Sequence, residues 1–349
     1  MVLTSLLRRV NGLLVVFFSL WHFIATAGCA AGYVLERRDF PDLTTNDPRV
    51  RWFSPVTPKD GRALQRWRSA VGPPVVRPAI RDWTSPADEL TIASWNTALG
   101  AGDVPRFAGT LPPGRPMVLL LQEVYRRGPE VPGVLPPDAA FARRQGGAAA
   151  GTRYASIEAI ATALGLSLYY VPSMRNGSPE ASSEDRGNAI LSSLPLEDLT
   201  AVELPFERQR RVAVAATISG VTSTGAPWRV RVVDVHLDNT FNPLRLSLAS
   251  EYGRTRQARG LLSTLDDGQP LILGGDFNTW SGFSDQAYRT LLRRFPDTRV
   301  IDRRATFRGW LRLDHLFFRL SPGSTATFRR ADGRFGSDHY PLVGSMRFR

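Results

Sequence analysis

Short apolar runs that end in polar side chains recur from about residue 90 to the C-terminus. Some runs alternate apolar and polar residues and others are continuously apolar, and both patterns are typical of β-strands. Helical patterns separate them over residues 154–165 and 246–265. Mixed strands and helices predict an α/β domain with a large two-layer sheet core over residues 90–349. The runs are LTIASW, MVLLLQE, LSLYYVP, NAILSS, VAVAATI, WRVRVVDVHL, PLILGGDF, LDHLFFRL and PLVGSMRF.

The polar residues that end these runs are carboxylates, amides and imidazoles. Since such strand ends meet at one edge of a sheet, we expect them to form a single site there. The two glycines before Asp276 would let another group approach the backbone closely. Oxygen ligands without cysteine suit a hard cation, Mg²⁺ or alternatively Mn²⁺ or Ca²⁺. The residues are Asn96, Gln122, Glu123, His236, Asn239, Asp276, Asn278, Asp314, Asp338 and His339.

This set of groups suits displacement at phosphorus. A divalent cation neutralises phosphate oxygens and stabilises the charge that develops in the transition state. Hydrolysis also needs a base for water, for which Asp276 is the candidate, and a histidine for the phosphorane or the leaving oxygen. Asp314 is a candidate to orient that histidine. His315 follows Asp314 directly and should face the other side of a strand, so we interpret it as structural.

Seven motifs follow one another along the chain: IASWN (92–96), LLQEV (120–124), GNAILSS (187–193), VDVHLDN (233–239), GGDFN (274–278), RLDHLFF (312–318) and SDHYPL (337–342). In this order they resemble the endonuclease/exonuclease/phosphatase superfamily. That superfamily includes pancreatic-type deoxyribonucleases, apurinic endonucleases, neutral sphingomyelinases and inositol polyphosphate phosphatases. The resemblance covers nearly all of residues 90–349 and implies a four-layer α/β sandwich, two mixed β-sheets face to face with helices outside.

The resemblance also implies roles for residues in the motifs. Glu123 is implied as a direct ligand of the metal, Asn96 as a residue near it, and Asp338 as a second acidic contact to it. Asp276 is implied as the base or water-positioning residue. Asn278 is implied as the residue that orients the phosphate or the nucleophile.

Two histidines complete the implied site. His339 resembles the histidine at the scissile phosphate, and Asp314 the carboxylate bonded to it. His236 matches the second phosphate-contacting histidine of the deoxyribonuclease and sphingomyelinase branches. The deoxyribonuclease branch pairs that histidine with an earlier glutamate, and none of residues 184–186 aligns with this role. Further candidates for substrate binding are Asn239, Asn188 and Arg211.

The formal net charge is +12, and Lys59 is the only lysine, so arginine carries the basicity. The excess is either a compositional bias or a fit to a phosphate-rich partner, because guanidinium forks match phosphate oxygens. Arginines on a helix commonly form its solvated face rather than a groove. The arginines open to both interpretations are Arg210, Arg211, Arg254, Arg256 and Arg259.

Residues 1–35 combine a basic lead with an apolar run over residues 10–35, the pattern of an export signal or membrane anchor. Three outcomes stay open: lipidation of Cys29 in a lipobox-like stretch, cleavage after residue 27, or retention across a bilayer. All three predict an extracytoplasmic or membrane-surface location, with membrane association through the N-terminus. Cys29 is the only cysteine, so an intrachain disulfide is excluded.

Residues 36–89 are rich in proline and arginine and show little periodicity. We predict a linker or a wrapping segment here, with one short amphipathic helix around residues 60–70.

Four functions are compatible with these features. The prediction is a Mg²⁺-dependent phosphodiester hydrolase, foremost an exported or membrane-tethered nuclease, because the domain is basic. A phospholipase C-type, sphingomyelinase-like enzyme is the alternative, favoured by the leader and by His236. A sugar phosphomonoesterase is disfavoured because the domain has no lysine. A basic, surface-tethered binding module is disfavoured because binding alone does not require Asp276 and His339 together.

Overall fold

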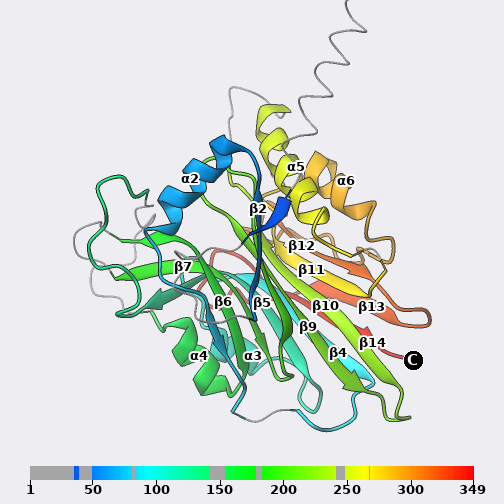
Figure 1. Cartoon of the computed structure of the whole chain (residues 1–349). Coiled ribbons are helices and arrows are strands. Elements are labelled where there is room, and N and C mark those ends of the chain that lie inside the picture. The colour runs from blue at the N-terminus through cyan, green and yellow to red at the C-terminus, as the bar shows by residue number, and fades with distance from the viewer. Residues whose placement is uncertain are drawn as a thin grey trace, which may run out of the picture.

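The computed structural model describes residues 35–38, 49–80, 83–140, 154–177, 183–240, 248–266 and 268–349. Two seven-stranded mixed β-sheets pack face to face, with helices outside them (Figure 1). This arrangement confirms the expected four-layer α/β sandwich. The leader and its three processing outcomes lie outside the described residues. Within the described part, no helix is long and apolar enough to cross a bilayer.

Sheet A has the strand order β1-β2-β8-β9-β10-β11-β12. The pairs β2–β8 and β10–β11 are parallel, and the other neighbours are antiparallel. The strands are β1 (Leu35–Arg38), β2 (Arg51–Pro55), β8 (Glu197–Glu203), β9 (Val212–Val221), β10 (Pro227–His236), β11 (Leu271–Asp276) and β12 (Asp314–Arg319).

Sheet B has the strand order β13-β14-β4-β5-β7-β6-β3, and β4–β5 is its one parallel pair among the described strands. The strands are β3 (Val75–Arg77), β4 (Glu89–Asn96), β5 (Met117–Arg127), β6 (Ser167–Asn176), β7 (Glu184–Ser192), β13 (Thr325–Arg330) and β14 (Leu342–Arg347).

The continuously apolar strands are buried on both faces, which explains the four layers. Ile272 and Leu120 pack in the core between the sheets. Leu271 and Leu273, on the opposite face of β11, pack in the outer core of sheet A. That core is covered by α5 (Leu248–Leu262), the 3₁₀ turn η1 (Gly282–Ser284) and α6 (Gln286–Leu292). The outer core of sheet B is covered by α3 (Val104–Ala108) and α4 (Ile157–Leu164).

Residues 49–80, which we call the N-terminal strap, add strands to both sheets. β2 pairs with β8 of sheet A and β3 pairs with β6 of sheet B. Between them lies α2 (Pro58–Arg68), which confirms the expected helix; the Thr57 hydroxyl accepts from Asp60 N at 3.2 Å and caps it. Trp67 of α2 packs on Phe206 after β8 and on Met174 of β6, so the helix joins the two sheets.

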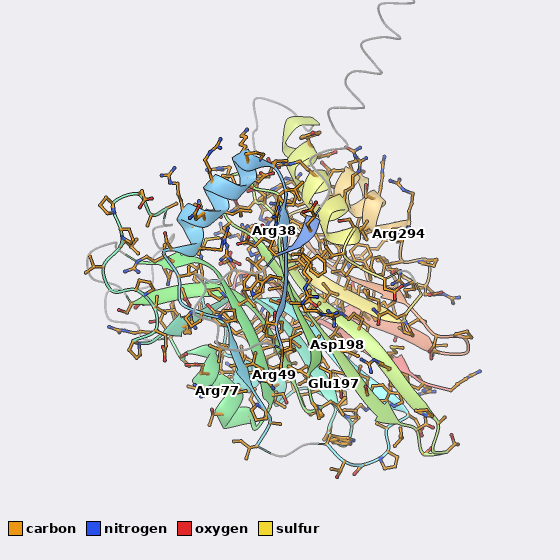
Figure 2. The ribbon with its side chains drawn as sticks, viewed as in Figure 1. Arg38, Arg49, Arg77, Glu197, Asp198 and Arg294 are labelled. Atoms are coloured by element: carbon orange, nitrogen blue, oxygen red, sulfur yellow. The ribbon has the colours of Figure 1, made fainter. Side chains whose placement is uncertain are left out.

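We call the end of the sandwich where β4, β5, β10 and β11 finish the polar edge. β12 and β14 begin at this edge, because they run antiparallel to β11 and β4. β2 also finishes there. It is parallel to β8, and β8 runs in the same direction as β10 because both are antiparallel to β9 between them. α2 lies at this end, whereas the labelled residues Arg49 and Glu197 lie at the opposite end (Figure 2).

Candidate active site

Three functional residues lie side by side in one row of sheet A. His236 ends β10 opposite Asp276, which ends β11, and Asp276 is in turn opposite Asp314, which begins β12. All three side chains are buried. Adjacent strand ends therefore bring an imidazole and two carboxylates to the polar edge, as the sequence predicts.

The two glycines before Asp276 allow neighbouring strands to pack closely against β11. A Cβ at Gly274 would lie 2.7 Å from Leu120 Cδ1 of the opposing sheet. A Cβ at Gly275, where φ is +159°, would lie 1.9 Å from Val235 O of β10. The groups that approach the backbone closely, as the sequence predicts, are therefore atoms of neighbouring strands.

Asp276 is the centre of the hydrogen-bond network. Its Oδ2 accepts from Asn96 Nδ2 at 2.9 Å, and its Oδ1 accepts from Asn278 N at 3.0 Å. Asn278 has a φ of +49° and donates from Nδ2 to Leu237 O at 3.0 Å, which fixes the turn after β11. Burial and the charge of Asp314 raise the pKa of Asp276 to about 7, against the effect of His339 and the two donated hydrogen bonds.

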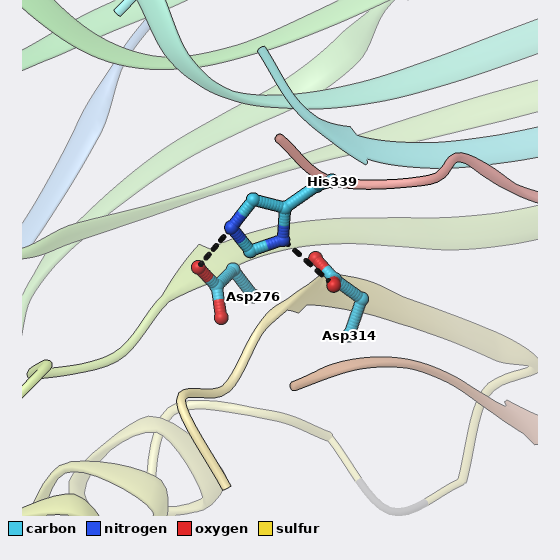
Figure 3. A group of neighbouring side chains, drawn as sticks. All are labelled: Asp276, Asp314 and His339. Carbon is cyan, nitrogen blue, oxygen red and sulfur yellow. Dashed lines mark hydrogen bonds and ion pairs between the residues drawn. The ribbon is translucent and has the colours of Figure 1, made fainter. Parts of the chain in front are cut away.

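His339 and Asp314 form a buried ion pair. His339 Nδ1 lies 2.8 Å from Asp314 Oδ2, and Nε2 points to Asp276 Oδ2 at 3.8 Å (Figure 3). The backbone holds the ring in place, since His339 N donates to Ser337 Oγ at 2.9 Å. Burial opposes the charged imidazolium, but Asp314 and Asp276 outweigh it and raise the pKa of His339.

The surroundings of His236 disfavour a positive charge on its ring, whereas those of His339 favour one. Arg211 Nη1 lies 3.0 Å from His236 Nδ1, and His236 Nε2 points to Asp276 Oδ2 at 3.4 Å. Burial and the positive charges of Arg211, His339 and Arg186 lower the pKa of His236 well below its usual value. A guanidinium can only donate, so Nδ1 accepts, and the ring is neutral with its proton on Nε2.

Glu123 reaches the site through a β-bulge. The register of β5 shifts between Leu121 and Val124, and Glu123 has a φ of +54°. Its side chain is 22% exposed, and its Oε1 lies 3.9 Å from His236 Nδ1, beyond hydrogen-bond distance. The bulge therefore turns a carboxylate out of the strand and into the pocket.

These residues line a pocket of about 580 Å³ at the polar edge. Asp314 lies behind His339, outside the lining. Asn188 is buried in β7, also outside the lining, and its Nδ2 has no hydrogen-bond partner among the described residues. His315 bonds to Thr279 Oγ1 at 2.8 Å and packs among outer-layer aromatics, as expected of a structural residue. The predicted residues in the lining are Asn96, Glu123, Arg211, His236, Asn239, Asp276, Asn278, Asp338 and His339.

The sequence did not identify several other lining residues. Arg186 on β7 is one of them, and alternation from the buried Asn188 could have indicated its inward direction. The remainder come from loops, whose paths depend on tertiary packing. They include Tyr154, Gln209, Phe307 and Arg308.

Most of the candidate groove arginines are structural. Arg210 is buried with Glu203 at 2.7 Å, and Arg254 with Asp285 at 2.9 Å. Arg256 pairs with Glu207 at 2.7 Å. The groove and the solvated-face interpretations are both wrong for the buried Arg210 and Arg254. Among these arginines, Arg211 lines the pocket.

The donor set fits a hard divalent cation. Glu123, Asp338 and the Asn96 amide line the same pocket as Asp276, and all offer oxygen atoms. Asn96 Oδ1 accepts from Ala98 N at 2.9 Å, which fixes the orientation of the amide. Several carboxylates that line one pocket form an electrostatic setting that favours such an ion.

The sandwich and the acid–imidazole site at its edge define a protein of the deoxyribonuclease I-like fold class. The chain belongs to the Endonuclease/Exonuclease/phosphatase family, whose sequence profile matches residues 93–339, more than half of its length. The nucleases and phosphatases that give this family its name hydrolyse phosphoester bonds. No match to a curated protein was found.

Solved structures similar to this chain include the following three. The endonuclease/exonuclease/phosphatase from Beutenbergia cavernae is 18% identical with a TM-score of 0.51, and the match covers 75% of this chain and 72% of that one. A family protein from Leptotrichia buccalis is 14% identical (TM-score 0.46; 74% and 99% covered). Sphingomyelinase C from Streptomyces griseocarneus is 16% identical (TM-score 0.41; 74% and 99% covered).

Proposed function

We propose that this protein is a divalent-metal-dependent phosphodiester hydrolase, exported or tethered to a membrane by its N-terminal segment. The observation that supports this most strongly is the convergence of two histidines on one buried carboxylate. Both His236 Nε2 and His339 Nε2 point to Asp276 Oδ2, at 3.4 and 3.8 Å. A binding module does not require two imidazoles in different protonation states around one acid.

Mg²⁺, or alternatively Mn²⁺, would be held by Glu123 and Asp338, with Asn96 beside it. When bound, the cation neutralises a phosphate oxygen and stabilises the charge that develops at phosphorus. Glu123 is suited to direct ligation, because the bulge points its carboxylate into the pocket.

Asp276 is the proposed base. Held from two sides by Asn96 and Asn278, its carboxylate is positioned to accept a proton from an attacking water. His339, kept protonated by Asp314, is the positive partner that stabilises the phosphorane or donates a proton to the leaving oxygen. Asn278 orients the nucleophile or the phosphate.

His236 has a separate role in this proposal. Because Arg211 occupies its Nδ1, His236 offers Nε2–H as a fixed neutral donor to a phosphoryl oxygen. Asn239 and Arg211, which also line the pocket, contribute to binding of the phosphodiester.

Two substrate classes remain candidates. A nuclease is supported by the net charge of +12, although buried ion pairs such as Arg210–Glu203 account for part of the arginine content. A phospholipase C-type enzyme is supported by the point at which the leader joins the fold, Leu35, which lies at the same edge of sheet A as the site.

The test is one preparation of the full chain, assayed with Mg²⁺ on plasmid DNA, RNA, sphingomyelin and an inositol polyphosphate. Turnover of a phosphodiester that stops in EDTA and returns with Mg²⁺ or Mn²⁺ would support the proposal. Full activity in chelator, or turnover of the inositol polyphosphate alone, would contradict it.

A further inference from the structure

The leader joins the folded protein at the polar edge. β1 pairs antiparallel with β2, and Leu35 is opposite Pro55, the last residue of β2. Two residues before Pro55, Phe53 is opposite Val202 of β8, and β8 finishes at the polar edge. Leu35 thus lies at the polar edge, one residue beyond the row of sheet A that contains His236 and Asp276, and the chain enters the fold from that edge.

The helix beside this entry point exposes cations. Asp60 is the one acidic residue of α2, and it is buried, where it accepts from Phe206 N and pairs with Arg256. The exposed charged residues of α2 are Lys59, Arg62 and Arg66. This surface is complementary to anionic lipid headgroups, which attract clusters of exposed cations.

Exposed aromatic side chains lie at the same edge. Among the exposed large apolar residues in the described part of the chain, two are aromatic, Trp310 and Tyr252, at 69% and 46% exposure. Trp310 belongs to the loop that pairs with the His339 segment through Phe307. Tyr252 follows Glu251, which accepts from Ser281 Oγ in the loop after β11. Tryptophan and tyrosine favour the interfacial layer of a bilayer.

We propose that the polar edge faces an anionic lipid bilayer, so that the pocket opens toward the membrane to which residues 1–34 tether the chain. The entry at Leu35 fixes which end of the sandwich lies next to the tether. Lys59, Arg62 and Arg66 supply attraction to headgroups, and Trp310 and Tyr252 supply interfacial contacts. The substrate class that fits this orientation is a phospholipid headgroup, a consequence that rests on the hydrolytic function proposed above.

The orientation can be measured without turnover. The full chain is placed in vesicles of phosphatidylcholine and phosphatidylglycerol that contain brominated lipids, which quench nearby tryptophans. Trp83 is the matched control, because it lies at the opposite end of the sandwich. Its backbone N donates to Ser193 O, which directly follows the end of β7. We expect Trp310→Phe to remove part of the quenched emission and Trp83→Phe to leave the quenched emission unchanged. Unchanged quenching in Trp310→Phe, or a loss confined to Trp83→Phe, would overturn the orientation.

A second pair of variants tests the charge contribution. Lys59→Gln, Arg62→Gln and Arg66→Gln together should weaken quenching of Trp310 in anionic vesicles. The same change at three exposed arginines toward the opposite end, Arg77, Arg229 and Arg347, should not. Equal effects of the two triple variants would contradict the inference. If the protein is inactive but Trp310 is quenched, only the hydrolytic function is refuted. If the protein is active but Trp310 is not quenched, only the orientation is refuted.

Discussion

Arg211 Nη1 lies 3.0 Å from His236 Nδ1, so the hydrogen-bond partner of Nδ1 in the second histidine of this site is a guanidinium and not a carboxylate. The resemblance to deoxyribonucleases predicts a glutamate in that position. Here burial and the charge of Arg211 lower the pKa of His236, and Arg211 fixes its proton on Nε2. The two histidines of the site therefore differ in charge: His339 is held protonated and His236 neutral.

Arg211→Met should reduce kcat by about 10- to 100-fold, the effect of one lost charge-assisted hydrogen bond of about 1.5–3 kcal/mol. Arg211→Lys keeps a charged donor and should retain more activity. The ¹⁵N shifts of His236 report its tautomer directly. A wild-type rate in Arg211→Met, with the Nε2–H tautomer intact, would show that Arg211 does not position His236.

The rate should depend on pH through two groups of opposite sign. Asp276 acts as a base only when deprotonated, so kcat/KM should rise with pH through its raised pKa, which a bound cation lowers. His339 acts only when protonated, so activity should fall above its raised pKa. Asp314→Asn removes the largest favourable charge beside His339 and should move the alkaline limb to lower pH. An alkaline limb that stays in place would mean that His339 does not produce it.

Glu123→Gln should weaken Mg²⁺ binding by about tenfold or more, because it replaces a charged ligand with a neutral one. Isothermal titration of the folded protein with Mg²⁺ measures this change without substrate. Glu130→Gln, an exposed acid beyond the same strand, is the control and should bind as the wild type does. Equal affinities in the two variants would remove Glu123 from the metal site.

Two glycine substitutions test the packing that holds the site. Gly275→Ala places a Cβ against Val235 O and should destabilise the fold by about 2 kcal/mol or more. Gly61→Ala, within α2 and with open space around its Cβ, should stabilise it by about 0.5–1 kcal/mol. Urea denaturation of both variants measures the free energies of unfolding. A neutral Gly275→Ala would mean that β10 and β11 can separate.

The sequence predicted those parts of the site that depend on strand ends. Asp276 and Asp314 could be placed together because apolar runs lead directly into each of them, and His315 could be set aside by alternation. The contact of Arg211 with His236 was not predictable, because Arg211 lies between β8 and β9, where packing sets its direction. From its helical position Arg254 is predicted to be solvated. Its buried ion pair with Asp285, which is distant in the sequence, could not be predicted. The pairing of the N-terminal strap with both sheets is likewise a long-range feature without a local pattern.

The most direct test of the central proposal is hydrolysis of bis(p-nitrophenyl) phosphate by the wild type, Asp276→Asn and His339→Ala, each with Mg²⁺ and with EDTA. We expect Mg²⁺-dependent turnover by the wild type and a loss of about 10²–10⁴-fold in each variant, with circular dichroism unchanged. Wild-type rates in both folded variants would contradict the proposal that Asp276 and His339 carry out phosphodiester hydrolysis.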